Sequence, residues 1–337
     1  MSKQHIADQA MLALGRHLLS EDYRFITPTP ATHDRVYQRF TPPLARNLRD
    51  VFGWSMPFDH TLFAREFLAG LVQAEIVERE GPLWRSTVRW SSLDGALFAH
   101  SAYPTSQADA VFFGPDSYRF AQMIDAYVQQ RSEPVRRAVD IGCGAGVGAL
   151  VVARAHPYAE VLAVDINPRA LRLSAVNAEL AGVDNISVYQ SDILGSVEGE
   201  FDLIIANPPY MNDSQQRAYR HGGGALGEAL SLRIVRESLP RLQKAGSLVL
   251  YTGVAMVEGR DLFLEAIQSM LADHAVGWTY RELDPDVFGE ELLKPGYERV
   301  ERIAVVALTV TRRHRAQCRS MVAPGTVAVC RNGGANG

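Results

Sequence analysis

The sequence predicts an α/β fold built on a parallel sheet that helices cover on both faces. From about Asp140 onward, short apolar runs of β type alternate with longer helical patterns, and this alternation is typical of parallel sheets. Before residue 105 the order differs, since helical stretches come first and short extended runs follow. The chain has 337 residues, of which 47% are hydrophobic, so it can form one large domain or two ordinary ones.

The first 105 residues predict a mainly helical domain that carries a small β-hairpin. Helices are expected over residues 8–19, 33–52 and 60–74, and extended runs over residues 76–79, 83–90 and 96–102, with turns at Gly81-Pro82 and Asp94-Gly95. This order is compatible with a winged helix, a substrate-recognition cap or a packing domain. Residues 1–110 hold 11 Lys and Arg against 12 Asp and Glu, so the positive face of a DNA-binding module is missing. We favour a cap for a protein or small-molecule substrate.

Aromatic side chains are dense in this half of the chain. Their positions are Phe25, Tyr37, Phe40, Phe52, Trp54, Phe58, Phe63 and Phe67. They either line a pocket or form a core, and core is the more frequent use of such residues.

Charge and cysteine content argue against several classes of protein. The net charge of −4 gives the whole molecule no attraction to a phosphate backbone. Cys143, Cys318 and Cys330 are too few and too scattered for a disulfide framework or a zinc site, so no metal is expected. The sequence has neither a run of about 18 apolar residues nor a secretory signal. A cytoplasmic protein without membrane contact is therefore expected.

Residues 313–337 predict a basic, flexible tail. The basic residues after the last apolar strand are Arg312, Arg313, Arg315, Arg319 and Arg331, with no acidic residue among them. A nucleic-acid-binding arm is the alternative interpretation. We favour a solvated tail, because the chain ends in small residues that have nothing to pack.

A glycine-rich loop between a strand and a helix is the first candidate binding site. Residues 137–141 form a short apolar strand, which runs into glycines at Gly142, Gly144, Gly146 and Gly148 before a helical stretch. Glycines permit a tight turn and let a ligand approach the backbone closely. A nicotinamide-binding loop would follow the order Gly-x-Gly-x-x-Gly, whereas here an acid precedes the glycines in the order Asp-x-Gly-x-Gly-x-Gly. That acid would repel a pyrophosphate.

This order resembles the first motif of class I S-adenosylmethionine-dependent methyltransferases. In that resemblance the loop of Gly142, Gly144 and Gly146 lies under the methionine part of the cofactor, and Asp140 lies near the cofactor's amino group, directly or through water. The resemblance covers residues 112–311 and implies a Rossmann-like sheet of seven strands with the last one antiparallel. Strands at residues 247–252, 277–282 and 301–310 would complete that sheet.

Acidic residues also end the next two predicted strands. Asp165 follows the strand at 160–164 and is placed to accept hydrogen bonds from ribose hydroxyls. Twenty-seven residues later, Asp192 follows the strand at 186–190. By resemblance Asp192 meets the adenine amine, while Ile166 and Ile193 flank the adenine ring.

The fourth strand, residues 201–206, leads into Asn207-Pro208-Pro209-Tyr210. This sequence is similar to the motif of methyltransferases that act on planar nitrogens, including release-factor glutamine and exocyclic-amine methyltransferases. An amide or aryl amine is a poor nucleophile because its lone pair is delocalised. The side-chain carbonyl of Asn207 and the backbone carbonyl of Pro208 can accept its two hydrogens and direct the lone pair at the sulfonium methyl. Tyr210 offers an aromatic face to the planar group or to the sulfonium.

Two further segments resemble parts of the same family. Phe113, Pro115 and Tyr118 precede a helix that ends near Gln130, and they are similar to the segment that closes over the cofactor. A helix cap explains the same residues without a ligand. Residues 220–227 predict a mobile substrate loop because of their glycine density, with His221 as a candidate base or a solvated side chain.

These observations predict an N-methyltransferase of two domains, a cap over residues 1–105 and a catalytic domain over residues 106–312. The cofactor is S-adenosylmethionine, and the acceptor is an amide or amine nitrogen, in a protein or small molecule rather than in nucleic acid. The N-terminal half does not match the bundle expected of release-factor methyltransferases, so the acceptor stays open. One alternative is an enzyme that cyclises S-adenosylmethionine itself, in the manner of azetidine synthases. Another is a non-catalytic cofactor-binding protein.

Overall fold

The computed structural model describes residues 3–213, 217 and 219–313. The predictions for Cys318, Cys330 and the basic tail after Arg313 lie outside these residues. None of the helices in the described part is long and apolar enough to cross a membrane.

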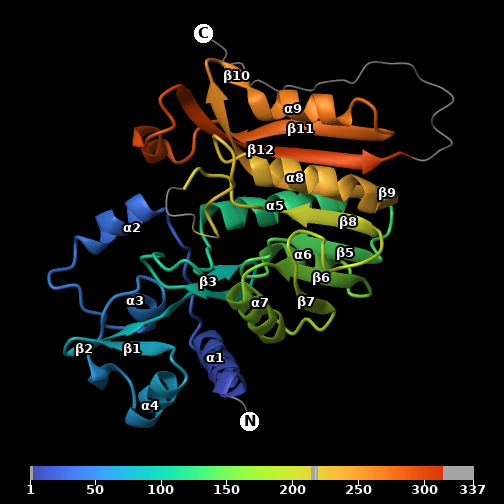
Figure 1. Ribbon diagram of the computed structural model, residues 1–337. Helices are drawn as coiled ribbons and strands as arrows, with labels where there is room; N and C mark the ends of the chain where they lie inside the picture. Colours follow the sequence, from blue (N-terminus) through green and yellow to red (C-terminus); the bar gives the residue numbers. More distant parts are fainter. Residues whose placement is uncertain (1–2, 214–216, 218, 314–337) are drawn as a thin grey trace, which may run out of the picture.

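One large sheet forms the centre of the C-terminal two thirds (Figure 1). Its strands are β5 (Arg137–Ile141), β6 (Glu160–Asp165), β7 (Ile186–Gln190), β8 (Phe201–Ala206), β9 (Leu242–Val257), β10 (Arg260–Asp261), β11 (Val276–Asp284) and β12 (Val300–Arg312). Seven of them follow the order β11-β12-β9-β8-β5-β6-β7, and the two-residue β10 pairs with β9. Strands β5 to β9 are parallel, whereas β12 is antiparallel to both β9 and β11. The predicted seven-stranded sheet with an antiparallel last strand is confirmed.

Helices cover both faces of this sheet because its strands carry apolar side chains on both sides. The helices are α5 (Pro115–Gln130), α6 (Val147–Ala155), α7 (Pro168–Leu180), α8 (Ala229–Ser238) and α9 (Leu262–Leu271), with short 3₁₀ turns η2 (Leu239–Arg241) and η3 (Gly289–Leu293). In β8, Leu203 and Ile205 pack in the cluster that contains α5 and α6. Their neighbours Ile204 and Ala206 pack in the cluster that contains α8 and α9. The alternation follows from the two-residue period of a strand.

The N-terminal region is mainly helical and carries two small hairpins. Its elements are α1 (Lys3–Ser20), α2 (Pro30–Tyr37), α3 (Leu48–Phe52), η1 (His60–Leu62), α4 (Arg65–Gln73), β1 (Val77–Glu80), β2 (Leu83–Ser86), β3 (Val88–Leu93) and β4 (Ala96–Ser101). β1 pairs with β2 and β3 with β4, with turns at Gly81-Pro82 and Asp94-Gly95 as predicted.

Four predictions for this region were wrong in detail. The helix expected over residues 33–52 is two helices, and Pro42 and Pro43 lie between them, where they supply no backbone N–H for a helix. The helix expected over 60–74 begins with a separate 3₁₀ turn. The extended run at 83–90 is divided at Thr87, whose backbone N–H donates to Ile76. One hairpin was expected and two are present.

The aromatic residues of the N-terminal region are core, as favoured above. Phe25, Phe52 and Phe58 are buried, and the other five pack against the same cluster. That cluster continues into the C-terminal part through Leu150 of α6 and Leu173 of α7, and α1 lies beside α7 (Figure 1). The two halves of the chain therefore share one continuous hydrophobic core.

A buried amide reinforces this junction. Asn177 of α7 accepts a hydrogen bond from the backbone N–H of Ala99 at 2.8 Å and donates to the Ala99 carbonyl at 3.1 Å and to the Ala145 carbonyl at 2.9 Å. Ala99 lies in β4, and Ala145 lies in the glycine-rich loop after β5. One side chain thus connects the N-terminal region to the predicted binding loop.

We expect Asn177→Ala to lower the free energy of unfolding by about 2–4 kcal/mol, because three buried backbone groups lose their partner. Urea denaturation followed by circular dichroism measures this loss. The control is Glu179→Ala, which changes an exposed residue of the same helix. An equal effect of both variants would contradict the bridging role.

Candidate cofactor and acceptor cavities

A deep cavity lies where the chain leaves β5, β6 and β8. Its volume is about 1030 Å³, including the part open to solvent. The predicted site residues in its lining are Gly142, Gly144, Asp165, Ile166, Asp192, Ile193, Asn207 and Pro208. The sheet topology brings these residues together, because the carboxyl ends of parallel strands lie at the same edge. We call this the first cavity.

The glycine-rich loop exposes its backbone to the first cavity. Gly142 and Gly144 have φ values of 68° and 54°, and a Cβ on either one would meet no atom within 4 Å. A ligand can therefore approach the main chain at these two positions. Gly146 also has a positive φ of 81°, but a Cβ there would collide with Ser174 of α7. Gly146 serves helix packing, and it is absent from the lining of the cavity.

Asp165 links the glycine-rich loop to the end of β6. One carboxylate oxygen accepts from the backbone N–H of Gly144 at 3.0 Å, and the other accepts from that of Asn167 at 2.9 Å. Burial raises the pKa of Asp165, while these backbone bonds oppose the change. Each oxygen keeps a lone pair for a further donor, which is the capacity that binding of ribose hydroxyls requires.

Asp140 lies behind the loop and outside the lining of the first cavity. Its side chain is 1% exposed, and it accepts a hydrogen bond from the backbone N–H of Ala149 at 2.8 Å. Burial raises the pKa of Asp140 to about 7, against the effect of the Ala149 bond and with a smaller contribution from the Asp165 charge. The carboxyl therefore fixes the start of α6 from below.

The far end of the first cavity combines an exposed ion pair with apolar side chains. Asp192 is paired with Arg233 of α8 at 2.9 Å, and its side chain is 61% exposed. Ile166 is 55% exposed, whereas Ile193 is buried with a positive φ of 52°. This end of the cavity therefore combines two apolar side chains with a carboxylate.

The segment before α5 contacts the first cavity through different residues from those predicted. Phe113 packs against Phe98, His100 and Tyr118, and Tyr118 accepts a hydrogen bond from the backbone N–H of Thr27. Phe113, Pro115 and Tyr118 all lie outside the cavity lining, which contains their neighbours Phe112, Ser117 and Phe120 instead. Successive side chains of this segment point in different directions. A residue that lines the cavity is therefore next to one that packs in the core.

A second cavity adjoins the first. It is lined by Phe112, Asp116, Asn207, Pro208, Pro209, Tyr210, Met211, Tyr219, Arg220 and Phe288. Phe112, Tyr219 and the segment Asn207-Pro208-Pro209 belong to both cavities. Within the described residues, no hydrogen bond engages the side-chain amide of Asn207. That amide is therefore available to a bound group.

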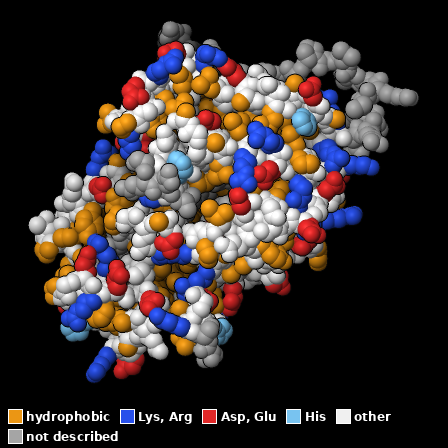
Figure 2. All heavy atoms as spheres, viewed as in Figure 1, with side chains coloured by type: hydrophobic (Ala, Val, Ile, Leu, Met, Phe, Trp, Pro, Cys, Tyr) orange, Lys and Arg blue, Asp and Glu red, His pale blue; other side chains and the backbone are white. Residues whose placement is uncertain are grey.

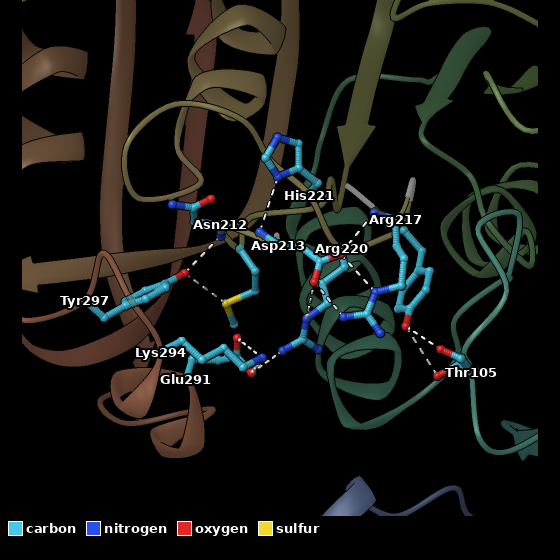
Figure 3. A network of polar contacts seen from close by, with 11 residues as sticks. Thr105, Asn212, Asp213, Arg217, Arg220, His221, Glu291, Lys294 and Tyr297 are labelled. Carbon is cyan, nitrogen blue, oxygen red and sulfur yellow. Dashed lines mark hydrogen bonds and ion pairs between the residues drawn. The ribbon is translucent and has the colours of Figure 1, made fainter. Parts of the chain in front are cut away.

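Ion pairs stabilise the outer wall of the second cavity (Figure 3). Arg220 pairs with the buried carboxylate of Glu291 in η3, and Arg217 pairs with Asp213 at 2.6 Å. Hydrogen bonds from Arg217 lower the pKa of Asp213 to about 2. The Tyr219 hydroxyl donates to the carbonyl of Thr105 at 2.8 Å. The segment after the Asn-Pro-Pro-Tyr sequence is thus tied both to η3 and to the N-terminal region.

His221 takes no part in either cavity. Its Nδ1 accepts from the backbone N–H of Asp213 at 3.2 Å (Figure 3). A backbone-bonded imidazole outside the cavity lining is a structural residue of the loop rather than a base.

Several residues of the two cavities escaped prediction from the sequence. They are Phe112, Asp116, Tyr219 and Phe288. Phe112 and Asp116 are adjacent in sequence to Phe113 and Pro115, which were predicted to contact the cofactor, so the sequence did indicate this segment. Phe288 comes from the connection between β11 and β12, where no pattern indicates a site.

The buried Asp140 predicts an unusual pH dependence of stability. Its pKa of about 7 exceeds the ordinary 3.8, so the folded chain holds a proton that the unfolded chain has released. Stability therefore falls as pH rises from about 4 to about 7 and is constant above. Relative to Asp140→Asn, the wild-type unfolding free energy should drop by up to about 4 kcal/mol over this range. Urea denaturation at several pH values measures the unfolding free energy of both proteins. Asp184→Asn, which changes an exposed residue, is the control. A difference between wild type and Asp140→Asn that does not change with pH would contradict the prediction.

The comparisons with known proteins agree with this geometry. Residues 122–256 match the family described as methyltransferase small domain. A release factor glutamine methyltransferase of Deinococcus radiodurans is 31% identical over 192 residues, which cover 56% of this chain and 66% of that protein. A ribosomal protein uL3 glutamine methyltransferase of Bordetella pertussis is 36% identical over 131 residues, 35% of this chain and 44% of that protein. A putative protein N5-glutamine methyltransferase of Methanocaldococcus jannaschii is 37% identical over 113 residues, 32% of this chain and 56% of that protein.

The matched region coincides with the part of the sheet that builds the first cavity. It runs from α5 through β5, β6, β7 and β8 into β9. The chain spans less than two thirds of the length of each of these relatives. The fold, the strand order and the match of residues 122–256 to the methyltransferase small domain family agree, and together they support a class I S-adenosylmethionine-dependent methyltransferase.

Proposed function

We propose that this chain transfers the methyl group of S-adenosylmethionine to an amide nitrogen of a protein. The observation that carries the proposal is the common wall of the two cavities, formed by Asn207, Pro208 and Pro209. A cofactor in the first cavity and an acceptor in the second would meet at this wall. The relatives with matching sequence are named for glutamine methylation in release factors and in ribosomal protein uL3.

Under this proposal the first cavity binds S-adenosylmethionine, which supplies the methyl group as a sulfonium. The open backbone at Gly142 and Gly144 would hold its methionine part, and Asp165 would accept hydrogen bonds from its ribose hydroxyls. Ile166, Ile193 and Asp192 would hold its adenine. These residues fit the cofactor in charge and shape, because the cavity combines carboxylates for hydroxyls and amines with apolar surface for a flat ring.

The remaining predicted residues support the site from outside the cavity. Gly146 packs the loop on α7, and Asp140 anchors α6 from outside the lining of the first cavity. Phe113 and Pro115 hold the segment that carries Phe112 and Ser117 to the cavity. We assign all four a positioning role.

Asn207 and the Pro208 carbonyl act on the acceptor nitrogen. They accept its two hydrogens, which localises the lone pair and directs it toward the methyl carbon. The nitrogen–carbon bond would form as the sulfur–carbon bond of the bound donor breaks, which would leave a neutral thioether. The nitrogen then carries a positive charge and loses one of its protons to water. No residue of this chain needs to act as a base before transfer.

A protein acceptor suits the charge of the second cavity better than a nucleic acid does. Among the described residues of its lining, Arg220 is the one cation, and it is already paired with Glu291. On the face in Figure 2, Lys and Arg side chains alternate with Asp and Glu, so this face has no continuous positive surface for phosphates. We propose residues 1–105 as the cap that presents the acceptor protein, residues 106–312 as the catalytic domain, and a cytoplasmic location beside the translation machinery.

We expect Asn207→Ala to lower kcat/KM for the acceptor roughly 100-fold or more, because the nitrogen loses its main hydrogen-bond acceptor. The assay mixes full-length release factors or ribosomal protein uL3 with methyl-labelled cofactor and locates the added methyl group by peptide mass spectrometry. The affinity for S-adenosylmethionine, from calorimetry, should change far less. Asn212→Ala, outside both linings, is the control. Full activity of Asn207→Ala would refute the assigned role.

Incubation with S-adenosylmethionine alone separates methyl transfer from cyclisation of the cofactor. A transferase without an acceptor should leave the cofactor intact, since no nucleophile reaches the methyl group. An enzyme that cyclises the cofactor would release methylthioadenosine, and Asn207→Ala would lose that release. Mass analysis of the mixture distinguishes the two reactions. Rapid, Asn207-dependent formation of methylthioadenosine would refute the proposed transfer, and binding of the cofactor without transfer to any protein would favour a non-catalytic role.

A further inference from the structure

The aromatic ring of Tyr210 is fixed from three sides. Its hydroxyl donates a hydrogen bond to Asp116 at 2.6 Å. A Cβ on Gly253 of β9 would collide with Cδ2 and Cε2 of the ring, so the ring lies directly on the β9 backbone. Phe288 packs edge-on at a centroid distance of 6.1 Å. The ring borders the second cavity, and these contacts leave it one orientation.

Asp116 is the centre of this arrangement. It stands in the first turn of α5, is 4% exposed, and receives a second hydrogen bond from the hydroxyl of Tyr251 of β9 at 2.8 Å. Arg119, one turn later, lies 3.4 Å from the same carboxylate and pairs with Asp284 of β11 at 2.8 Å. A buried carboxylate is stable only when its oxygens are satisfied. Two phenols and one guanidinium satisfy it here.

The position of Asp116 separates it from the cofactor. Its side chain belongs to the lining of the second cavity and not to that of the first. Changes at Asp116 should therefore alter the handling of the acceptor and leave cofactor binding intact. The family match begins only at residue 122, so it assigns nothing to this residue.

We propose that Asp116 is a positioning residue for methyl transfer, which holds the Tyr210 ring against the acceptor through its hydroxyl. The proposal rests on the proposed function, because the Tyr210 ring matters to catalysis only if a planar acceptor lies in the second cavity. A ring held in advance costs no ordering when the acceptor binds, and it keeps the acceptor nitrogen aligned with Asn207. Both oxygens of Asp116 are engaged by phenols, so the carboxylate acts through Tyr210 and not as a base.

The test compares three variants of the full chain. Asp116→Ala removes the hydrogen-bond acceptor of both phenols. Asp116→Asn keeps the shape, since its amide oxygen accepts from one phenol and its NH₂ donates to the other oxygen. Tyr210→Phe removes the same bond from the other side and serves if Asp116→Ala fails to fold. Asp125→Ala, an exposed carboxylate on the same helix, is the matched control.

We expect Asp116→Ala and Tyr210→Phe each to lower kcat/KM for the acceptor roughly 10- to 100-fold, with a cofactor affinity within about twofold of the wild type. Asp116→Asn should keep most of the activity. The double variant Asp116→Ala/Tyr210→Phe should have a kcat/KM no lower than that of the less active single variant. Wild-type acceptor kinetics in Asp116→Ala or Tyr210→Phe would overturn the proposal. Equal loss in Asp116→Asn and Asp116→Ala, with an active Tyr210→Phe, would also overturn it and favour a role of the charge.

A spectroscopic measurement separates this proposal from the proposed function. The ¹³Cζ resonances of Tyr210 and Tyr251 report the hydrogen bonds to Asp116 in the absence of any acceptor. Each resonance is assigned by its disappearance in Tyr210→Phe or Tyr251→Phe. They should shift in Asp116→Ala and stay in place in Asp125→Ala. A wild type that methylates no acceptor would contradict the proposed function, whatever the resonances do. Unshifted resonances would overturn the positioning role, whatever the acceptor proves to be.

Discussion

The reversal of strand order beside β5 is the constraint on which the site depends. From β5 the chain proceeds outward through β6 and β7, and it then returns to place β8 on the other side. The connections after β5 and β8 therefore leave in opposite directions, and a crevice opens between them at the carboxyl ends of the strands. Gly142 and Gly144 form one wall of this crevice and Asn207 the other. The glycine-rich loop and the Asn-Pro-Pro-Tyr segment face each other for topological reasons, before any side chain contributes.

Three polar side chains, of which Asn177 and Asp116 are buried and Asp165 is half-buried, then hold the elements around the crevice in register. Asn177 connects α7 to β4 and the glycine-rich loop, Asp165 connects that loop to β6, and Asp116 connects α5 to β9 and Tyr210. Apolar packing is not directional, so it supplies stability without fixing the positions of loops to fractions of an ångström. The N-terminal region shares a continuous core with α6 and α7, and movement of this region would therefore disturb the cofactor loop as well.

The sequence predicted the sheet well because its strands depend on local patterns, and several of the residues that it singled out at strand ends line the first cavity. The bounds of β5, β7 and β8 agree with the apolar runs, and Asp165 and Asn207 lie where the strands end. It failed where orientation decides, as with Phe113, which packs on Phe98 while Phe112 faces the cavities. The acid before the glycines indicated a ligand contact, but Asp140 points under α6. Phe288 reaches the second cavity from the distant β11–β12 connection, where Glu291 also pairs with Arg220, and no local pattern encodes such an encounter.

The two cavities differ in how freely the residues of their linings can change without disturbing the sheet. The first is built from strand ends and the loops immediately after them, so a change there disturbs the sheet itself. The second takes Phe288 from the β11–β12 connection and Arg220 from the loop after Tyr210, and Tyr219 of that loop is tied to Thr105 of the N-terminal linker. These segments can change without altering the strand order. A fold of this kind can keep one cofactor and one Asn-Pro-Pro-Tyr sequence while its acceptor changes, and the acceptor specificity should follow the connections and the N-terminal region rather than the sheet.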